Sequence, residues 1–339
     1  MKTHVFDYQT LKEAAAWVRS GELVAFPTET VFGLGAIANN QEAVAKVFEA
    51  KGRPSDNPLI VHVAKPKDVE LVAESISPLA QALMERFWPG PLTIIFPLKA
   101  NILPSNVTGG KNSVAVRMPK SLETLLMIEM VGFPMVGPSA NRSGKPSPTL
   151  IEHVIHDFDG QIAGVIQPSK PVEIGVESTV VLPQEDRILI LRPGAITQSM
   201  LASLGYPVEE VSAREQLARP EVLSPGVKYR HYSPKQPVYM IPANASISQW
   251  HIFVNKFEHV AILADQAILQ TLSSANLVAH YNLGPVGDIA AATANLFAGL
   301  RALEASEASV ILVQTFDDLE NEAAHAYMNR LSKAAESML

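Results

Sequence analysis

Three polar segments interrupt apolar, strand-like runs and carry the side chains with which this 339-residue chain could do chemistry. The first segment, residues 27–35 (PTETVFGLG), sets hydroxyls and a carboxylate ahead of two glycines, directly after a predicted strand. Glycines, which lack a Cβ, let a small polar ligand approach the backbone closely. The same residue types also form tight turns with local hydroxyl hydrogen bonds, and this segment alone does not decide between a ligand site and a turn.

The second segment, residues 51–58 (KGRPSDNP), combines two cations with an amide in a loop stiffened by prolines, and it leads on to His62. The planar guanidinium of Arg53 and the point charge of Lys51 together suit the oxygens of a polyphosphate. Lys51 alone is explained as well by the end of a predicted helix, where a cation gains about 0.3–1 kcal/mol from the helix dipole. With Arg53 and Asn57 beside it, the phosphate interpretation is favoured.

The third segment, residues 137–144 (GPSANRSG), also follows a short apolar run and extends toward Thr149. Serine and asparagine side chains donate and accept, which fits an adenine edge or a phosphate, although turns contain the same residues. The sequence has no G-x-x-x-x-G-K-[ST] loop, no H-E-x-x-H and no G-x-S-x-G, and Ala38 stands where a G-x-G-x-x-G needs its third glycine. A nucleotide would therefore be bound by other means.

Composition places the chain among compact α/β proteins of the cytoplasm. It has 47% hydrophobic and 18% charged residues and no cysteine, which excludes disulfide scaffolds and thiolate zinc sites. No apolar run approaches the roughly 20 residues that span a bilayer, and the first residues show no secretory signal pattern. The net charge of −7 argues against a broadly basic nucleic-acid binder, and most of it falls after residue 235.

The elements that must position the three segments alternate between strand-like and helix-like runs over residues 1–211. Strands are predicted at residues 59–63, 92–96 and 113–117, and helices at residues 42–50 and 151–158. This alternation predicts an α/β domain built on one twisted, mixed sheet.

A second rhythm follows a break in the pattern. Residues 212–236 contain prolines without sustained periodicity and are predicted to be a linker. Residues 237–339 then alternate short strands, at 238–241, 260–264, 277–280 and 310–314, with helices that include 286–305 and 319–337. This pattern predicts a smaller Rossmann-like parallel sheet, and because it lacks the glycine fingerprint we assign it no organic cofactor.

A set of short motifs occurs along the chain in a fixed order: PTETVFGLG at 27–35, KGRPSDNPL at 51–59, PGPLT at 89–93, VRMP at 116–119, PSAN at 138–141, ESTV at 177–180 and LRPG at 191–194. Each is unremarkable alone, but the ordered set resembles the YrdC-like threonylcarbamoyl-AMP synthases. Residues 224–234 (SPGVKYRHYSP) match the linker of the long form, which adds a C-terminal Rossmann-like domain. The resemblance therefore covers nearly the whole chain.

The resemblance implies an ATP-consuming enzyme. Members of this family condense L-threonine, bicarbonate or CO2, and ATP into threonylcarbamoyl-AMP and pyrophosphate. A downstream transferase then passes the threonylcarbamoyl group to a tRNA adenosine. The resemblance implies ATP as a substrate, Mg2+ travelling with the nucleotide, no protein-bound metal and no membrane partner, and it leaves open a weak contact with tRNA.

The resemblance also implies roles for individual residues. Threonine would be held by Thr30, His62, Arg117, Ser139 and Ser178, with the Arg117 guanidinium facing the substrate carboxylate. Lys51 and Arg53 are the expected catalytic cations, beside the phosphates. ATP would be held by Arg53, Asn57, Ser113, Asn141, Thr149 and Arg192, and by Arg230 and Tyr232 of a linker folded over it as a lid. Phe32 departs from the family, in which many members have tyrosine there, so no hydroxyl role is expected at this position.

Two alternatives of other classes remain. One is a carbamoyl-transfer or acyl-phosphate enzyme of the same fold, of the kind found in hydrogenase maturation proteins; those carry cysteine motifs that this chain lacks. The other is a non-catalytic RNA-binding module, against which the near-neutral charge of residues 1–235 counts.

Overall fold

The structure is a computed structural model that describes residues 2–218, 231–318 and 321–339. These residues form two compact units. The N-terminal unit contains residues 2–143, 150–172 and 177–218, and the C-terminal unit contains residues 231–318 and 321–339 together with two segments from earlier in the chain, Gly144–Thr149 and Glu173–Val176. The domain limits expected from the sequence, at residues 211 and 237, stay a prediction.

The N-terminal unit is built on one mixed sheet of eleven strands in the order β1-β8-β2-β3-β7-β4-β6-β5-β9-β10-β11. The strands are β1 His4–Phe6, β2 Val24–Phe26, β3 Gly33–Ile37, β4 Ile60–His62, β5 Leu92–Pro97, β6 Ser113–Arg117, β7 Met135–Val136, β8 Gly164–Ile166, β9 Thr179–Pro183, β10 Ile188–Arg192 and β11 Val208–Glu210. The helices are α1 Leu11–Arg19, α2 Gln41–Lys51, the 3-10 helix η1 Pro66–Leu71, α3 Pro78–Phe87, α4 Ser105–Thr108, α5 Leu122–Val131, α6 Ile151–Phe158, α7 Gln198–Ala202 and α8 Ala213–Ala218. The mixed sheet predicted from the sequence is confirmed.

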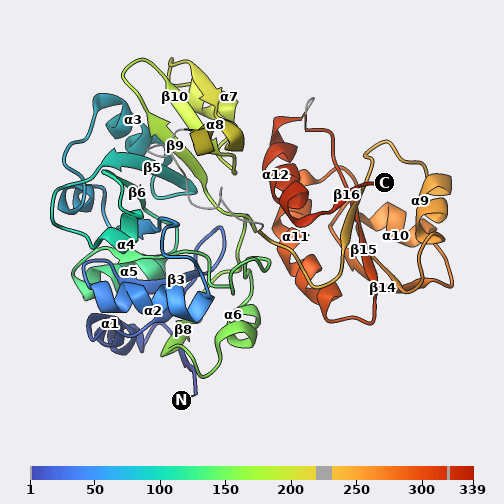
Figure 1. The fold of residues 1–339 in the computed structure, drawn as a ribbon, viewed down its shortest axis with the longest axis horizontal. Helices are drawn as coiled ribbons and strands as arrows, with labels where there is room; N and C mark the ends of the chain where they lie inside the picture. The colour runs from blue at the N-terminus through green and yellow to red at the C-terminus, as the bar shows by residue number, and fades with distance from the viewer. Residues whose placement is uncertain (1, 219–230, 319–320) are drawn as a thin grey trace. The chain divides into compact units, whose positions relative to one another are not determined.

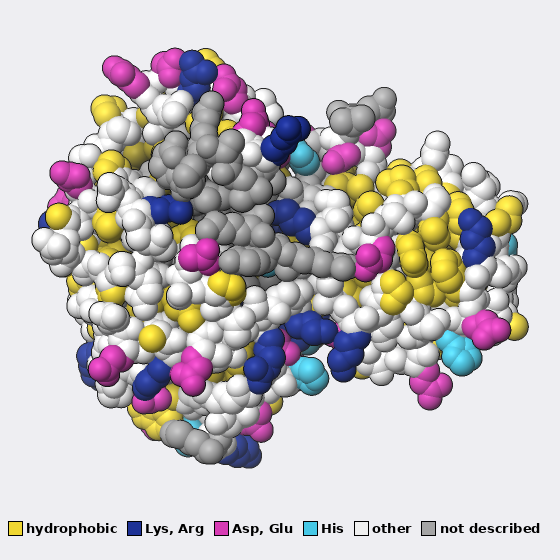
Figure 2. Space-filling model, in the orientation of Figure 1, with side chains coloured by type: hydrophobic (Ala, Val, Ile, Leu, Met, Phe, Trp, Pro, Cys, Tyr) yellow, Lys and Arg dark blue, Asp and Glu magenta, His cyan; other side chains and the backbone are white. Residues whose placement is uncertain are grey.

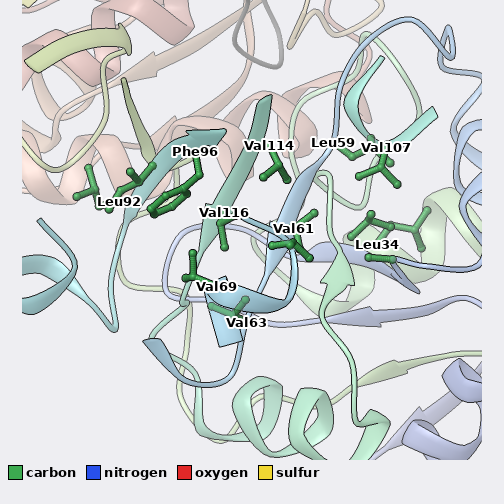
Figure 3. Packing of buried hydrophobic residues seen from close by; sticks show 14 of the residues in the cluster. Leu34, Leu59, Val61, Val63, Val69, Leu92, Phe96, Val107, Val114 and Val116 are labelled. Carbon is green, nitrogen blue, oxygen red and sulfur yellow. The ribbon is translucent and has the colours of Figure 1, made fainter. Parts of the chain in front are cut away.

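The main core lies on one face of this sheet. Val61, Val114 and Val116, from the neighbouring strands β4 and β6, pack there with Phe96 and Leu34, as Figure 3 shows. Burying each such side chain contributes about 1.5–3 kcal/mol, so this face fixes the register of the central strands. On the opposite face, α1 and α5 enclose a smaller cluster over β1, β2 and β8, which includes Phe26 and Met135.

Local signals set the ends of the helix that leads into the second polar segment. The Asn40 side chain accepts hydrogen bonds from the backbone N–H groups of Glu42 and Ala43 and so caps the start of α2. Gly52 ends the helix in the left-handed conformation, with φ of 61°. Lys51 therefore occupies the last turn of α2, as the sequence predicted.

The C-terminal unit has five parallel strands in the order β14-β13-β15-β12-β16, which confirms the expected Rossmann-like sheet. The strands are β12 Val238–Ile241, β13 Val260–Ala264, β14 Leu277–Asn282, β15 Val310–Gln314 and β16 Ser337–Met338; the helices are α9 Ile247–Val254, α10 Gln266–Thr271, α11 Ile289–Glu304, the 3-10 helix η3 Glu322–Ala324 and α12 His325–Ala334. Helices α9 and α10 cover one face of the sheet, and α11 and α12 cover the other (Figure 1).

One local prediction was wrong. The last helix, expected over residues 319–337, is α12 from His325 to Ala334, because Ser337 and Met338 pair with the sheet edge at β12; residues 319 and 320 lie outside the described residues. In the first polar segment, Gly33 and Gly35 lie in strand β3. A Cβ at either glycine would meet the Phe26 ring within 3 Å, so the close approach that requires glycine is to a neighbouring strand. None of the helices in the described ranges combines the length and apolar character needed to cross a bilayer.

Candidate active site

Polar side chains gather on the face of the central strands that is opposite the main core. His62 and Arg117 are register partners on the parallel strands β4 and β6. Their neighbours Val61 and Val116 point into the core, so alternation along a strand places His62 and Arg117 together on the other face. Ser113, four residues before Arg117 on β6, shares this face for the same reason.

Arg117 is held rigidly at the end of β6. Its Nη2 lies 2.7 Å from Glu29 Oε1, its Nη1 donates to Thr30 Oγ1 at 2.9 Å and its Nε donates to the Gly90 carbonyl at 3.1 Å. Both ionic side chains are only 4% exposed. The second Glu29 oxygen accepts from the Lys120 backbone N–H at 2.8 Å. A buried ion pair is tolerated when further hydrogen bonds reach both of its charged groups, as those to Thr30, Gly90 and Lys120 do here.

Two of the five guanidinium N–H donors of Arg117 stay outside these three hydrogen bonds. They belong to the terminal nitrogens Nη1 and Nη2, because Nε carries a single N–H. A carboxylate is the ligand that such a pair of donors suits best. The arrangement therefore suits a small carboxylate, and the assignment of Arg117 to a substrate stays a prediction.

His62 is a neutral imidazole beside this arginine. It is 2% exposed, and burial, followed by the positive charge of Arg117, lowers its pKa to about 3. The Phe26 ring lies edge-on to it at 5.3 Å. Its Nδ1 has no hydrogen-bond partner within the described residues, which is costly for a buried polar atom and marks a position where a ligand would bind.

Gly137 borders the imidazole. A Cβ at this position would lie 2.8 Å from His62 Nδ1 and 2.4 Å from the Phe26 ring. Glycine is therefore required at the start of the third polar segment by the side chains it passes.

A second group of polar side chains forms where β5, β9 and β10 adjoin. The hydroxyls of Ser178 and Thr93 lie 2.7 Å apart. Arg192 donates from Nε to the Ser178 carbonyl at 3.1 Å and from Nη2 to the Ser178 hydroxyl at 3.2 Å. All three side chains are buried. The turn at residues 90–91 links this group to Arg117, because Gly90 O accepts from Arg117 and Pro91 O accepts from the Thr179 N–H.

A third group ties the end of α2 to the segment 137–144. The buried Lys51 ammonium donates to the carbonyls of Ser139 and Asn141, the latter at 2.6 Å, and the Lys51 carbonyl accepts from the Ser143 N–H at 2.8 Å. Ser139 also forms an isolated antiparallel β-bridge with Gly33, which lies in the same polar segment as Thr30. Lys51 thus holds the loop that carries Ser139 and Asn141, a role that the sequence did not suggest.

The other predicted ATP contacts lie outside these three groups of side chains. Arg53 Nη2 donates to the Pro58 carbonyl at 3.1 Å, and Asn57 is buried in the same loop. Thr149 and Tyr232 belong to the C-terminal unit, where the Tyr232 ring packs 5.0 Å from that of Phe297. Arg230 lies outside the described residues. The assignment of these residues to ATP stays a prediction.

Sequence reasoning missed Glu29 and Thr93. Glu29 precedes the predicted threonine contact Thr30, and its carboxylate among the hydroxyls of the first polar segment was its only signal. Thr93 sits in the PGPLT motif, and only its 2.7 Å contact with Ser178 identifies it. Within the described residues, no cluster of three or more His, Asp or Glu could hold a metal ion.

Two family models match this chain. A family model described as "Telomere recombination" matches residues 16–194, and one described as "Threonylcarbamoyl-AMP synthase, C-terminal domain" matches residues 196–336. The threonylcarbamoyl-AMP synthase of Bacillus subtilis (strain 168) is 41% identical over 96% of this chain and 92% of its own length. That of Pyrococcus abyssi (strain GE5 / Orsay) is 40% identical over 96% and 94%.

A solved structure extends the match to three dimensions. The crystal structure of P. abyssi Sua5 complexed with L-threonine superposes with a TM-score of 0.88 at 35% sequence identity, covering 99% of this chain and 100% of that chain. The family models and these relatives thus agree over nearly the whole sequence. The chain belongs to the threonylcarbamoyl-AMP synthase family, in its long form with the additional C-terminal domain.

Proposed function

We propose that this protein is an L-threonylcarbamoyladenylate synthase, which condenses L-threonine, bicarbonate and ATP into threonylcarbamoyl-AMP and pyrophosphate. The observation that carries the proposal is the buried Arg117, fixed by Glu29 and Thr30 beside the neutral His62. This arrangement suits the carboxylate of an amino acid, and the P. abyssi relative was crystallised with L-threonine.

Threonine binds through its carboxylate to the two remaining terminal N–H donors of Arg117. The hydroxyls of Thr30, Ser139 and Ser178 and the open Nδ1 of His62 provide further polar contacts. With a pKa of about 3, His62 is too weak a base to take a proton at neutral pH. It orients the substrate instead.

ATP binds through the cations and amides of the loop after α2 and of the neighbouring strands. Arg53, Asn57, Ser113, Asn141 and Arg192 are its proposed contacts in the N-terminal unit, and Thr149, Arg230 and Tyr232 those farther along the chain. Mg2+ enters with the nucleotide and offsets the charge of its phosphate oxygens, so no cluster of protein ligands is needed.

The reaction needs no nucleophilic side chain. The neutral threonine amine attacks bicarbonate to give the carbamate and water, and a carbamate oxygen then attacks the α-phosphate and displaces pyrophosphate. The protein positions the two reactants and stabilises the developing charge, which can together contribute several kcal/mol. Arg53 is the cation proposed to offset charge on the leaving pyrophosphate, and Lys51 holds the Ser139–Asn141 loop in place.

The product is an activated intermediate, and a downstream transferase would pass its threonylcarbamoyl group to tRNA in the cytoplasm. A binding module for RNA is less well supported. The visible face of the N-terminal unit, at the left of Figure 2, carries acidic as well as basic side chains. Tight RNA binding draws most of its affinity from a basic surface, and residues 1–235 are near neutral in charge.

The test is product formation from defined substrates. The purified protein should release pyrophosphate and form an AMP-containing product only when ATP, threonine and bicarbonate are all present, as measured by chromatography and mass spectrometry. Arg53→Ala should keep the fold and lose activity by about two orders of magnitude or more. Arg187→Ala is the matched control. It removes two partly exposed ion pairs, with Asp186 and with Glu209, and should stay fully active.

An AMP-containing product formed without threonine would contradict the proposal and favour a carbamoyl- or acyl-phosphate enzyme. Near-normal pyrophosphate release by a folded Arg53→Ala variant would remove Arg53 from the mechanism.

A further inference from the structure

Helix α11 of the C-terminal unit contacts the segment Gly144–Thr149, which begins three residues after the PSAN motif ends. Arg301, in the last turn of α11, donates to the Pro146 carbonyl from Nε at 3.0 Å and from Nη2 at 2.7 Å. Two N–H groups of one guanidinium on a single carbonyl form a charge-assisted contact that leaves the segment little freedom. Arg301 and Pro146 are 155 residues apart in sequence.

Glu304, at the end of the same helix, secures the segment a second time. Its Oε1 lies 2.6 Å from the Lys145 ammonium, and the two side chains are 16% and 34% exposed. The same oxygen accepts from the Lys235 backbone N–H at 2.8 Å, and the Gly144 carbonyl accepts from the Ser233 N–H at 2.8 Å. The segment is therefore held both by α11 and by the stretch of chain at residues 233–235.

A second segment packs so closely against α11 that it needs a glycine at the point of contact. Gly175, within Glu173–Val176, has φ of +79°, and a Cβ there would lie 2.4 Å from Ala294 Cα and 2.5 Å from its carbonyl oxygen. This segment ends one residue before the ESTV motif that contains Ser178. One helix of the C-terminal unit thus contacts two short segments, and each adjoins a motif that carries predicted site residues.

We propose that α11 is a positioning element for nucleotide binding, in which Arg301 and Glu304 fix the segment that ends at the predicted ATP contact Thr149. The proposal rests on the proposed function, which supplies the identity of the nucleotide. Its physical basis is entropy: each loop residue ordered on binding costs about 1–2 kcal/mol, and a segment already ordered by α11 avoids that cost when ATP arrives. The C-terminal unit so contributes to ATP binding without the glycine fingerprint that a nucleotide site of its own would need.

The first test is Arg301→Ala in the full-length protein. Hydrogen exchange of the four amides in this segment (Gly144, Lys145, Ser147 and Thr149), measured without substrates, should become faster, while exchange in the β4–β6 pair stays unchanged. The KM for ATP should rise about tenfold or more, as expected for losing charge-assisted hydrogen bonds, while the KM for threonine changes less than about twofold. Arg301→Lys, which keeps one charged donor, should recover part of the loss.

Lys256→Ala is the control in the same unit, because the Lys256 ammonium lies over the ring of Phe253. It should leave both KM values and the exchange of residues 144–149 unchanged. Unchanged exchange of these amides in Arg301→Ala would overturn the proposal, as would an equal rise in both KM values. Because exchange is measured without substrates, it tests the positioning role even if the proposed reaction were wrong.

The second test asks whether Lys145 acts through Glu304 or directly on the nucleotide. Lys145→Gln, Glu304→Gln and the double variant are compared, and the amide oxygen that Glu304→Gln introduces can still accept from the Lys235 N–H. If the ion pair positions the segment, the double variant should raise the KM for ATP no more than the worse single variant. If the two single-variant increases in the KM for ATP multiplied in the double variant, Lys145 and Glu304 would act independently. That result would contradict the positioning role of Glu304.

Discussion

The buried pair of Glu29 and Arg117 is the most consequential contact at the scale of single residues. Glu29 does not reach the substrate in the proposed mechanism; it orients the guanidinium that does. Removing one partner of a buried ion pair leaves the other uncompensated and costs about 3–5 kcal/mol. Binding of a carboxylate to Arg117 also depends on the angle at which Glu29 holds the guanidinium.

We therefore expect Glu29→Gln to raise the KM for threonine about tenfold or more, with a smaller effect on the KM for ATP. Urea unfolding should show a loss of about 3 kcal/mol in the free energy of unfolding. Glu22→Gln is the matched control, because Glu22 pairs with Lys46 on the surface, where both side chains are more than 40% exposed. Equal losses of stability in the two variants would contradict the burial argument.

His62 makes stability depend on pH. Its pKa is about 3 in the folded protein and about 6.5 in the unfolded chain, so between these values only the unfolded state binds the proton. Stability contributed by neutral His62 is thus fully present above pH 6.5 and is lost as the pH falls toward 3. Between pH 7 and pH 5 this loss should be about 2 kcal/mol.

The measurement is urea unfolding of the wild type and of His62→Gln at pH 7 and pH 5. The variant cannot titrate at this position, so its stability should fall by about 2 kcal/mol less over the same interval. Parallel pH profiles for the wild type and His62→Gln would show that burial does not hold His62 neutral.

At the scale of elements, the strand period and the helix caps bring the site together. Alternation on β4 and β6 sends valines to the core and His62 and Arg117 to the opposite face. The cap at Gly52 ends α2 where Lys51 can reach the carbonyls of Ser139 and Asn141. One helix end thereby fixes a loop 88–90 residues farther along the chain.

Lys51→Met tests this role. Losing two charge-assisted hydrogen bonds should free the loop, speed hydrogen exchange of residues 139–143 and lower activity about tenfold or more. Lys46→Met on the same helix removes an exposed ion pair with Glu22. It should change neither the hydrogen exchange of residues 139–143 nor the activity. If Lys51→Met lost activity while exchange in the loop stayed slow, Lys51 would act on the phosphates directly, as the sequence first suggested.

At the scale of the whole molecule, the proposed site exists only in the folded chain. Its threonine contacts run from Thr30 to Ser178, so the unfolded state cannot bind the amino acid. A ligand at about 100 times its Kd that binds only the native state adds about 2.7 kcal/mol of stability. Threonine should therefore raise Tm by about 4 °C in a thermal scan.

Glu29→Gln should lose most of this shift with threonine and keep the shift produced by ATP, because only the carboxylate receptor has changed. Glycine, which has the carboxylate and amine but no side chain, should give a smaller shift than threonine. A threonine shift that survives in Glu29→Gln would place the amino acid elsewhere.

The sequence by itself determined the strongly periodic elements and the family. Strands β6, β12, β13 and β15 and helix α6 were predicted with their observed limits, because apolar runs and turn residues act within a few positions of one another. The ordered motifs also indicated the polar segments that hold Thr30, Lys51 and Ser139.

Only the tertiary structure decided what those residues touch. Arg117 pairs with Glu29, which is 88 residues away. The Lys51 ammonium donates hydrogen bonds to two backbone carbonyls, and Arg301 binds the segment Gly144–Thr149, which belongs to the C-terminal unit. Strand β3 pairs with β7 and the edge strand β16 pairs with β12, and in both cases the partner is distant in sequence. Such contacts are selected by packing and desolvation across the whole fold, which local periodicity does not encode.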